Sequence, residues 1–197
     1  MSDLLNVTDL RVTFPIRRQG AMPWAKPDQL RAVNGVDFTL RPGETLGVVG
    51  ESGCGKSTLA RALIGLVPAT GKAEWIDGKD LLALTPGQMM AYRSDIQMVF
   101  QDPLASLNPR MTVGQIIAEP LTTHRPDLGR AEVKDRVRAM MDKVGLLPNQ
   151  INRYPHEFSG GQCQRIGIAR ALIVEPRLII CDEPVSALDV SIQAQVI

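Results

Sequence analysis

The sequence predicts an α/β fold, and three observations lead to that class. Residues 4–14 and 31–40 alternate apolar with polar side chains, which is typical of half-exposed strands. Two apolar runs without alternation, 45–50 and 177–181, suit parallel strands that are buried on both faces. A helix-compatible segment, 57–66, follows the first of these runs. Strands of both kinds with helices between them predict a mixed α/β protein.

The first two predicted strands are expected to pair as antiparallel neighbours. Residues 19–29 between them contain two prolines and a glycine, which predicts a loop insertion. The segment RPGE at 41–44 predicts the turn that ends the second strand. The predicted buried strand 45–50 then leads into the strongest motif of the chain.

That motif is the glycine-rich segment 50–57, GESGCGKS, which matches the pattern GxxxxGK[ST] between a predicted strand and a helix. Its glycines let successive backbone N–H groups point into one concavity, where the helix dipole favours phosphate oxygens. Lys56 can reach the β- and γ-phosphates, and the Ser57 hydroxyl can bind Mg²⁺. The nucleotide-contacting residues predicted in this loop are Gly50, Glu51, Ser52, Gly53, Cys54, Gly55, Lys56, Ser57 and Thr58.

A second helix start precedes the last strand. Ser159 is predicted to be the N-cap of a helix that continues to Val174. The adjacent glycines expose backbone N–H groups, which predicts a second anion site. One nucleotide bound at the first anion site cannot obviously reach the second site of the same chain. The simplest interpretation is that the second site contacts a nucleotide bound to another copy of the chain. Its residues are Ser159, Gly160, Gly161 and Gln162.

The buried run 177–181 ends in two carboxylates. Asp182 can hold Mg²⁺ through water, and Glu183 can polarise an attacking water. Alone, an Asp-Glu pair after a strand usually marks a loop, but together with the phosphate loop it predicts phosphoryl-transfer chemistry.

The composition excludes several classes of protein. With 197 residues, 44% of them hydrophobic, and a mean hydropathy of −0.02, the chain is predicted to be globular. Its 22 Lys and Arg against 21 Asp and Glu argue against a nucleic-acid binder that relies on bulk positive charge and leave only a local basic patch open. The N-terminus lacks the pattern of a signal peptide, and no apolar run reaches membrane-spanning length. Three scattered cysteines, without a CxxC pair, fit a reducing compartment such as the cytosol.

The motifs GESGCGKST, VFQDP, FSGGQCQR, LIICDEP and SALD follow one another in the order found in ABC-transporter ATPase subunits, which the chain resembles over nearly its whole length. Segments 30–61 and 98–121 resemble the oligopeptide/dipeptide importer branch, particularly its F-type ATPase subunit. The resemblance implies a P-loop NTPase (RecA-like) core with an antiparallel β subdomain and a helical subdomain at about 104–172. Residues 1–197 would then form a partial nucleotide-binding domain, incomplete at the C-terminus.

The resemblance also implies roles for single residues. Gln101 would bind Mg²⁺ and act in catalysis beside Lys56 and the general base Glu183. Asp189 would contact the nucleotide site across the subunit interface. An aromatic side chain would stack on the adenine of ATP; Phe14 is the candidate, and Trp24 competes with it.

The implied function is ATP hydrolysis that energises an importer of oligopeptides, dipeptides or a related solute. Implied partners are permease subunits, a second identical or homologous ATPase subunit and, indirectly, a periplasmic solute-binding protein; no nucleic acid is implied. The implied location of the chain is the cytoplasmic face of the inner membrane. The alternatives are an ATPase accessory to a carbon–phosphorus lyase, another non-transport ABC ATPase such as a ribosome-associated factor, and a binding module without turnover. A DNA-repair head is disfavoured because the proline-rich stretch 102–158 leaves no room for a long coiled coil.

Two expectations concern the rest of the chain. A switch histidine would lie beyond Ile197; His124, expected in a loop, and His156, expected at the surface, do not stand in that position. The core strand expected between the strands at 45–50 and 177–182 would also lie beyond Ile197. Unpaired backbone groups on those two strands are therefore expected to make these 197 residues alone aggregation-prone and inactive. Between Gln101 and Arg130, helix-breaking prolines alternate with apolar residues that either form a groove for a permease helix or fill the helical subdomain's own core. Those apolar residues are Leu104, Leu107, Met111, Ile116 and Ile117.

Overall fold

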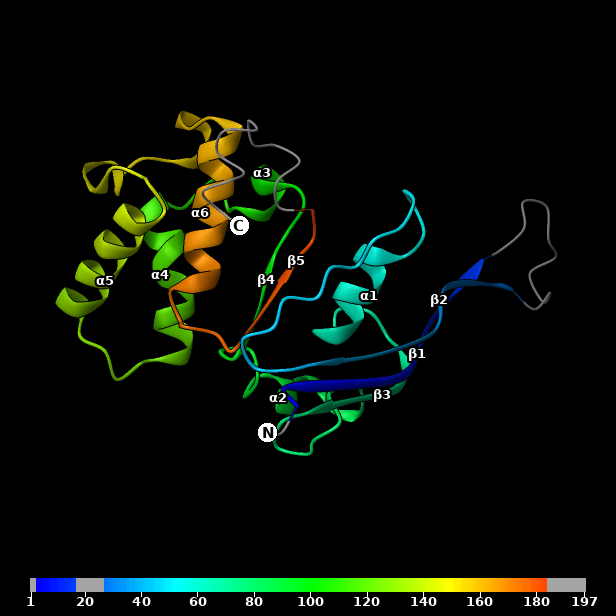
Figure 1. The fold of residues 1–197 in the computed structure, drawn as a ribbon. Coiled ribbons are helices and arrows are strands. Elements are labelled where there is room, and N and C mark those ends of the chain that lie inside the picture. Colours follow the sequence, from blue (N-terminus) through cyan, green and yellow to red (C-terminus); the bar gives the residue numbers. More distant parts are fainter. Residues whose placement is uncertain (1–2, 17–26, 184–197) are drawn as a thin grey trace. The chain divides into compact units, whose positions relative to one another are not determined.

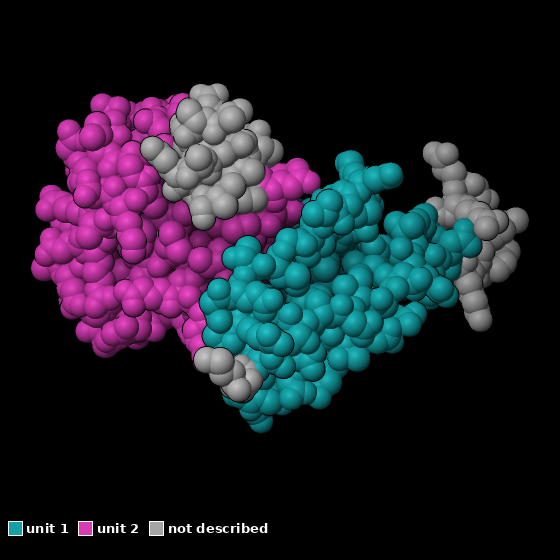
Figure 2. Space-filling model, in the orientation of Figure 1, with its two compact units in different colours: residues 1–91 teal, residues 92–197 magenta. Residues whose placement is uncertain are grey.

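The computed structural model describes residues 3–16 and 27–183. The chain divides into two compact units, Met1–Ala91 and Tyr92–Ile197 (Figure 2). The first unit is built on an antiparallel sheet, and the second combines helices with a parallel strand pair. The predicted mixed α/β class is thereby confirmed.

The first unit contains a three-stranded sheet in the order β2-β1-β3 (Figure 1). Its elements are β1 (Leu5–Ile16), β2 (Asp28–Leu40), α1 (Lys56–Leu63), β3 (Thr70–Trp75), a 3₁₀ turn (Leu81–Ala83) and α2 (Pro86–Met89). The predicted antiparallel pairing of the first two strands is confirmed. Both strands extend beyond their predicted ends, because Pro15 and Ile16 pair with Gln29 and Asp28: β1 continues to Ile16, and β2 begins at Asp28, within the predicted insertion.

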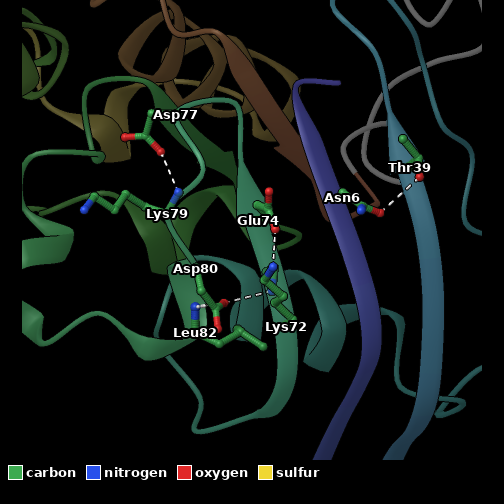
Figure 3. Close-up of polar contacts among 9 residues, drawn as sticks. Asn6, Thr39, Lys72, Glu74, Asp77, Lys79, Asp80 and Leu82 are labelled. Atoms are coloured by element: carbon green, nitrogen blue, oxygen red, sulfur yellow. Dashed lines mark hydrogen bonds and ion pairs between the residues drawn. The ribbon is translucent and has the colours of Figure 1, made fainter. Parts of the chain in front are cut away.

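Side-chain hydrogen bonds hold β3 and the turn after it in place (Figure 3). One oxygen of Asp80 accepts from the backbone N–H of Ala73 at 2.9 Å and from that of Leu82 at 3.1 Å. Across the first two strands, the Thr39 hydroxyl donates to Asn6 Oδ1 at 3.2 Å (Figure 3). The edge strand β3 is therefore tied to the chain that follows it as well as to β1.

The prediction of a buried strand over residues 45–50 is wrong. These residues form no strand, and they are exposed, including 96% of the Val49 surface. A parallel strand forms only beside a neighbour that accepts and donates its backbone hydrogen bonds. No strand among the described residues pairs with this run, so its apolar composition alone does not make it a strand.

The second unit carries the other helices and a short sheet in which β4 and β5 run parallel (Figure 1). Its elements are β4 (Ile96–Val99), α3 (Pro103–Ser106), α4 (Val113–His124), α5 (Arg130–Lys143), 3₁₀ turns at Pro148–Gln150 and Pro155–Glu157, α6 (Gly160–Leu172) and β5 (Leu178–Cys181). The last strand confirms the predicted strand before Asp182, but its predicted burial on both faces is wrong, because only Leu178 of β5 is buried while Ile179 and Cys181 are exposed. The assignment of residues 104–172 to a helical subdomain stays a prediction.

The core of the second unit is formed where α4, α5 and α6 pack together. On α4, Val113, Ile116, Ile117 and Leu121 follow the i, i+3, i+4 spacing of one helix face, and all four are buried. Leu107 is buried in the same cluster. Of the two alternatives that the sequence left open, Leu107, Ile116 and Ile117 therefore follow the second: they fill the unit's own core rather than line a groove.

Two details of α4 differ from the sequence prediction. Pro120, expected to break a helix, lies inside α4, and His124, expected in a loop, is its last residue. Proline removes one backbone hydrogen bond and crowds the preceding turn. Here a capping box between Thr112 and Gln115 starts the helix, and the buried residues on both sides of Pro120 hold it in the core. Tertiary packing thus outweighs the local preference.

Arginine side chains attach α6 to its neighbours. Arg170 donates to the carbonyl oxygen of Ser106, at the end of α3, at 2.7 Å. Burial lowers the pKa of Arg170, with the nearby Glu119 opposing that shift. Arg165 donates to the carbonyl oxygens of Val144 and Gly145, just after α5, at 3.0 and 3.2 Å. These bonds fix the helix whose N-terminus carries the second predicted anion site.

Candidate functional site

The predicted site residues divide between the two units. The phosphate loop, residues 50–58, and Phe14 belong to the first unit, whereas Gln101, Asp182 and Glu183 belong to the second with the helix start at 159–162. Asp189 and Trp24 lie outside the described residues.

The phosphate loop is a turn closed by its own lysine. The backbone N–H of Cys54 donates to the Glu51 carbonyl oxygen at 3.3 Å. Lys56 Nζ donates to the carbonyl oxygens of Gly50 and Glu51, both at 2.9 Å, and lies 4.0 Å from Cys54 Sγ. The ammonium group is therefore held at the loop that is predicted to enclose phosphate oxygens. Phosphate contact by these residues stays a prediction.

A bulge in the sheet explains why glycine stands immediately before that lysine. Val33 pairs with Val12 and Arg31 with Thr13, so Ala32 is the extra residue between them. A Cβ atom on Gly55 would lie 2.2 Å from the Ala32 carbonyl oxygen, and its φ of 101° favours glycine as well. Any larger residue would separate the loop from β2.

Phe14 lies near this contact along the same sheet. It pairs with Leu30 across β1 and β2, two residues before Ala32, and 36% of its surface is exposed. Strand pairing thus places Phe14 on the part of the sheet that contacts Gly55, and an exposed aromatic ring is able to stack on a nucleotide base. The role of Phe14 is still a prediction.

The structure confirms Ser159 as the N-cap of α6. The Gln162 N–H donates to Ser159 Oγ at 3.3 Å, while the Ser159 N–H donates to Gln162 Oε1 at 2.9 Å. Both side-chain oxygens are thus used within the helix start. The N–H groups of Gly160 and Gly161 lie in the first turn, where the helix itself offers no acceptor. These two amides remain the predicted donors to an anion.

The structure brings Gln101 and Glu183 together. Gln101 Nε2 donates to Glu183 Oε2 at 2.8 Å, and the Asp182 N–H donates to the Val99 carbonyl oxygen at 3.0 Å. Sequence reasoning treated the glutamine and the glutamate separately and missed this contact. The signal that could have revealed it is the shared end of two parallel strands, which places the residues after each strand at one edge of the sheet.

The neighbouring residues differ sharply in environment. Asp182 is buried, with 4% of its surface exposed, whereas Glu183 is exposed. The two carboxylates thus lie in different environments, which suits different roles for them.

Magnesium was predicted to bind Ser57, Gln101 and Asp182. In the parts of the chain that the structure describes, no group of three or more His, Cys, Asp or Glu residues could hold a metal ion. The predicted set instead combines a hydroxyl, an amide oxygen and a carboxylate. These are hard oxygen donors, which Mg²⁺ prefers, and the ion completes its coordination with water and phosphate oxygens. The donor chemistry fits the ion, and the site stays a prediction.

Sequence comparison relates the chain to known families. A sequence profile described as "ABC transporter" matches residues 33–186. The chain is 70% identical over 195 residues to the oligopeptide transport ATP-binding protein OppF of Salmonella typhimurium, covering 98% of this chain and 58% of that protein. It is 53% identical over 195 residues to AppF of Bacillus subtilis, with the same coverage. The chain thus spans somewhat more than half the length of these relatives.

Structure comparison gives a consistent result. The dimeric cassette MJ0796 in a post-hydrolysis state bound to ADP and Pi matches with a TM-score of 0.84 and 27% sequence identity, over 98% of this chain and 79% of that one. A second dimeric MJ0796 structure, a bacterial ABC transporter cassette, matches equally well. Among the helices in residues 3–16 and 27–183, none is long and apolar enough to span a membrane.

Proposed function

The chain belongs to the ABC transporter family, and from this premise we propose that it is the ATP-binding and ATP-hydrolysing part of a peptide importer. The observation that carries the proposal is the glycine-rich loop at the start of α1, with Lys56 Nζ held 2.9 Å from two loop carbonyl oxygens. The match to oligopeptide transport ATP-binding proteins over 98% of the chain supports peptides or a related solute as the cargo.

The proposed reaction depends on positioning and electrostatics. Lys56 and the loop amides bind the β- and γ-phosphates, and Glu183 polarises the attacking water. Bound Mg²⁺ neutralises phosphate charge; Ser57, Gln101 and Asp182 are the residues that would hold it. Phe14 stacks on the adenine. The amides of Gly160 and Gly161 serve the nucleotide of a second ATPase subunit, identical or homologous, and Asp189 contacts the site across the same interface.

The proposed partners are permease subunits, at the cytoplasmic face of the inner membrane, with a periplasmic solute-binding protein acting through them. Dimeric cassettes among the structural neighbours support a second ATPase subunit. The carbon–phosphorus lyase alternative is not favoured, because the relatives at 50–70% identity include oligopeptide and di/tripeptide transport proteins.

The proposal is tested on the complete subunit, produced in its native host with an affinity tag. We expect permease subunits to co-purify from detergent-solubilised membranes and peptide uptake to stop when the gene is deleted. Recovery of a soluble lyase complex without permease subunits, with unchanged uptake, would contradict the proposal.

A separate prediction concerns coupling to the permease. Among the five apolar residues for which a groove or a core position was predicted, Leu104 is largely exposed, at 55% of its surface. We expect Leu104→Glu in the complete transporter to reduce peptide uptake at least about fivefold while ATP affinity stays within twofold, because a charge in an apolar contact is costly to desolvate. Leu147→Glu, at another exposed leucine of the second unit, is the matched control. Normal uptake with Leu104→Glu would remove this residue from the docking surface.

A further inference from the structure

We propose that Gln101 is a positioning residue for Glu183: its amide nitrogen orients the carboxylate that polarises the attacking water. This inference rests on the proposed ATPase function. It differs from a role of Gln101 as a metal ligand alone, because it uses the nitrogen end of the amide rather than the oxygen end.

The first support is the strand register. Ile96, Gln97, Met98 and Val99 of β4 pair in order with Leu178, Ile179, Ile180 and Cys181 of β5. The residue numbers of the two partners differ by the same amount at each pair, and the numbers of Gln101 and Glu183 differ by that amount too. Gln101 and Glu183 therefore lie two positions beyond the last pair, Val99 and Cys181, at the edge where both strands end. Sheet register, rather than chance approach of two loops, sets them opposite each other.

The second support is the contact itself. Gln101 Nε2 donates to Glu183 Oε2 at 2.8 Å, within the ordinary range of an N–H···O hydrogen bond. The bond from the Asp182 N–H to the Val99 carbonyl oxygen continues the pairing as far as the residue before Glu183. The carboxylate is thus anchored through its backbone neighbour and through its own side chain.

The third support is the backbone of Glu183. Its φ of 48° lies in the left-handed region, which residues other than glycine, asparagine and aspartate seldom adopt. Such a conformation persists where the surroundings hold it, and it is frequent at functional sites. The hydrogen bond from Gln101 is one contact that holds the side chain of this strained residue.

The chemistry explains why the residue is a glutamine. A primary amide has a donor end and an acceptor end, so it can donate to a carboxylate through Nε2 while Oε1 is directed to another ligand, such as a metal ion. A glutamate at the same place supplies oxygens but no donor, and it would set two carboxylates side by side. The substitution Gln101→Glu therefore removes the proposed positioning bond and keeps an oxygen ligand.

The experiment uses the complete subunit assembled with its partners. We expect Gln101→Glu to lower kcat for ATP about 10- to 100-fold, the effect of a misplaced catalytic group, while KM for ATP stays within about twofold. The matched control is Gln97→Glu, the same change within β4; Gln97 pairs with Ile179 and donates to the carbonyl oxygen of Arg93. This control should keep wild-type kcat.

The reciprocal exchange tests the contact without any nucleotide. Gln101→Glu alone should lower the Tm of the subunit, because two carboxylates then face each other. Combining it with Glu183→Gln restores one amide and one carboxylate, and we expect that double variant to recover most of the lost Tm.

A kcat of Gln101→Glu within twofold of wild type, or a Tm of the double variant no higher than that of Gln101→Glu, would overturn the inference. An absence of ATP hydrolysis by the wild-type complex would instead contradict the proposed function, and the Tm comparison would still decide whether the two residues are coupled.

Discussion

Lys56→Ala in the complete subunit is expected to abolish ATP turnover, with kcat falling at least about 10²- to 10³-fold, the cost of losing one preorganised donor to the reacting group. Lys56 is the only lysine or arginine in the phosphate loop, residues 50–57. Its Nζ already lies 2.9 Å from two loop carbonyl oxygens, so little reorganisation is needed to reach a phosphate. Alanine leaves the glycine turn in place but removes the charge that offsets the developing negative charge.

The measurement is steady-state ATP hydrolysis together with equilibrium binding of ATP. Lys79→Ala removes an exposed lysine elsewhere in the first unit and should leave turnover unchanged. Lys56→Arg should also fail, because a planar guanidinium does not replace a compact ammonium group in a tight loop. Wild-type turnover by Lys56→Ala would show that the phosphate loop is not where the γ-phosphate reacts.

Glu183→Gln is expected to lower kcat about 10²- to 10⁴-fold, the usual contribution of a general base, while ATP still binds. The two side chains have nearly the same shape, but an amide cannot take up a proton from the attacking water. The introduced amide oxygen still accepts from Gln101 Nε2, so the 2.8 Å contact has an acceptor after the change. The loss should therefore fall on kcat and not on folding.

Single-turnover hydrolysis and retention of unhydrolysed ATP provide the measurement. Glu175→Gln makes the same change at an exposed glutamate before β5 and serves as the control. If Glu183→Gln hydrolysed ATP at the wild-type rate, the base would have to be sought elsewhere. If it lost ATP binding altogether, Glu183 would have a binding role rather than a catalytic one.

Local patterns in the sequence were sufficient to predict several features of the structure. The alternation of apolar and polar residues predicted the antiparallel pair that became β1 and β2, because one buried face requires that period. The SGGQ segment predicted an N-cap at Ser159, since a hydroxyl and a glutamine three residues apart satisfy the first helical N–H groups. The order of the motifs predicted the family that the comparisons then confirmed.

By itself, then, the sequence determined the features whose causes lie within a few residues: the N-terminal strand pair, the cap of α6, the strand before Asp182 and the motif order. Only the tertiary structure decided the features that depend on distant partners. Residues 45–50 form no strand without a described neighbour. Ile116 and Ile117 belong to the core, Pro120 is accommodated within α4, and Gln101 reaches Glu183 across two parallel strands. Strand pairing, packing and cross-strand hydrogen bonds join residues far apart along the chain, so neither composition nor spacing near one position determines their outcome.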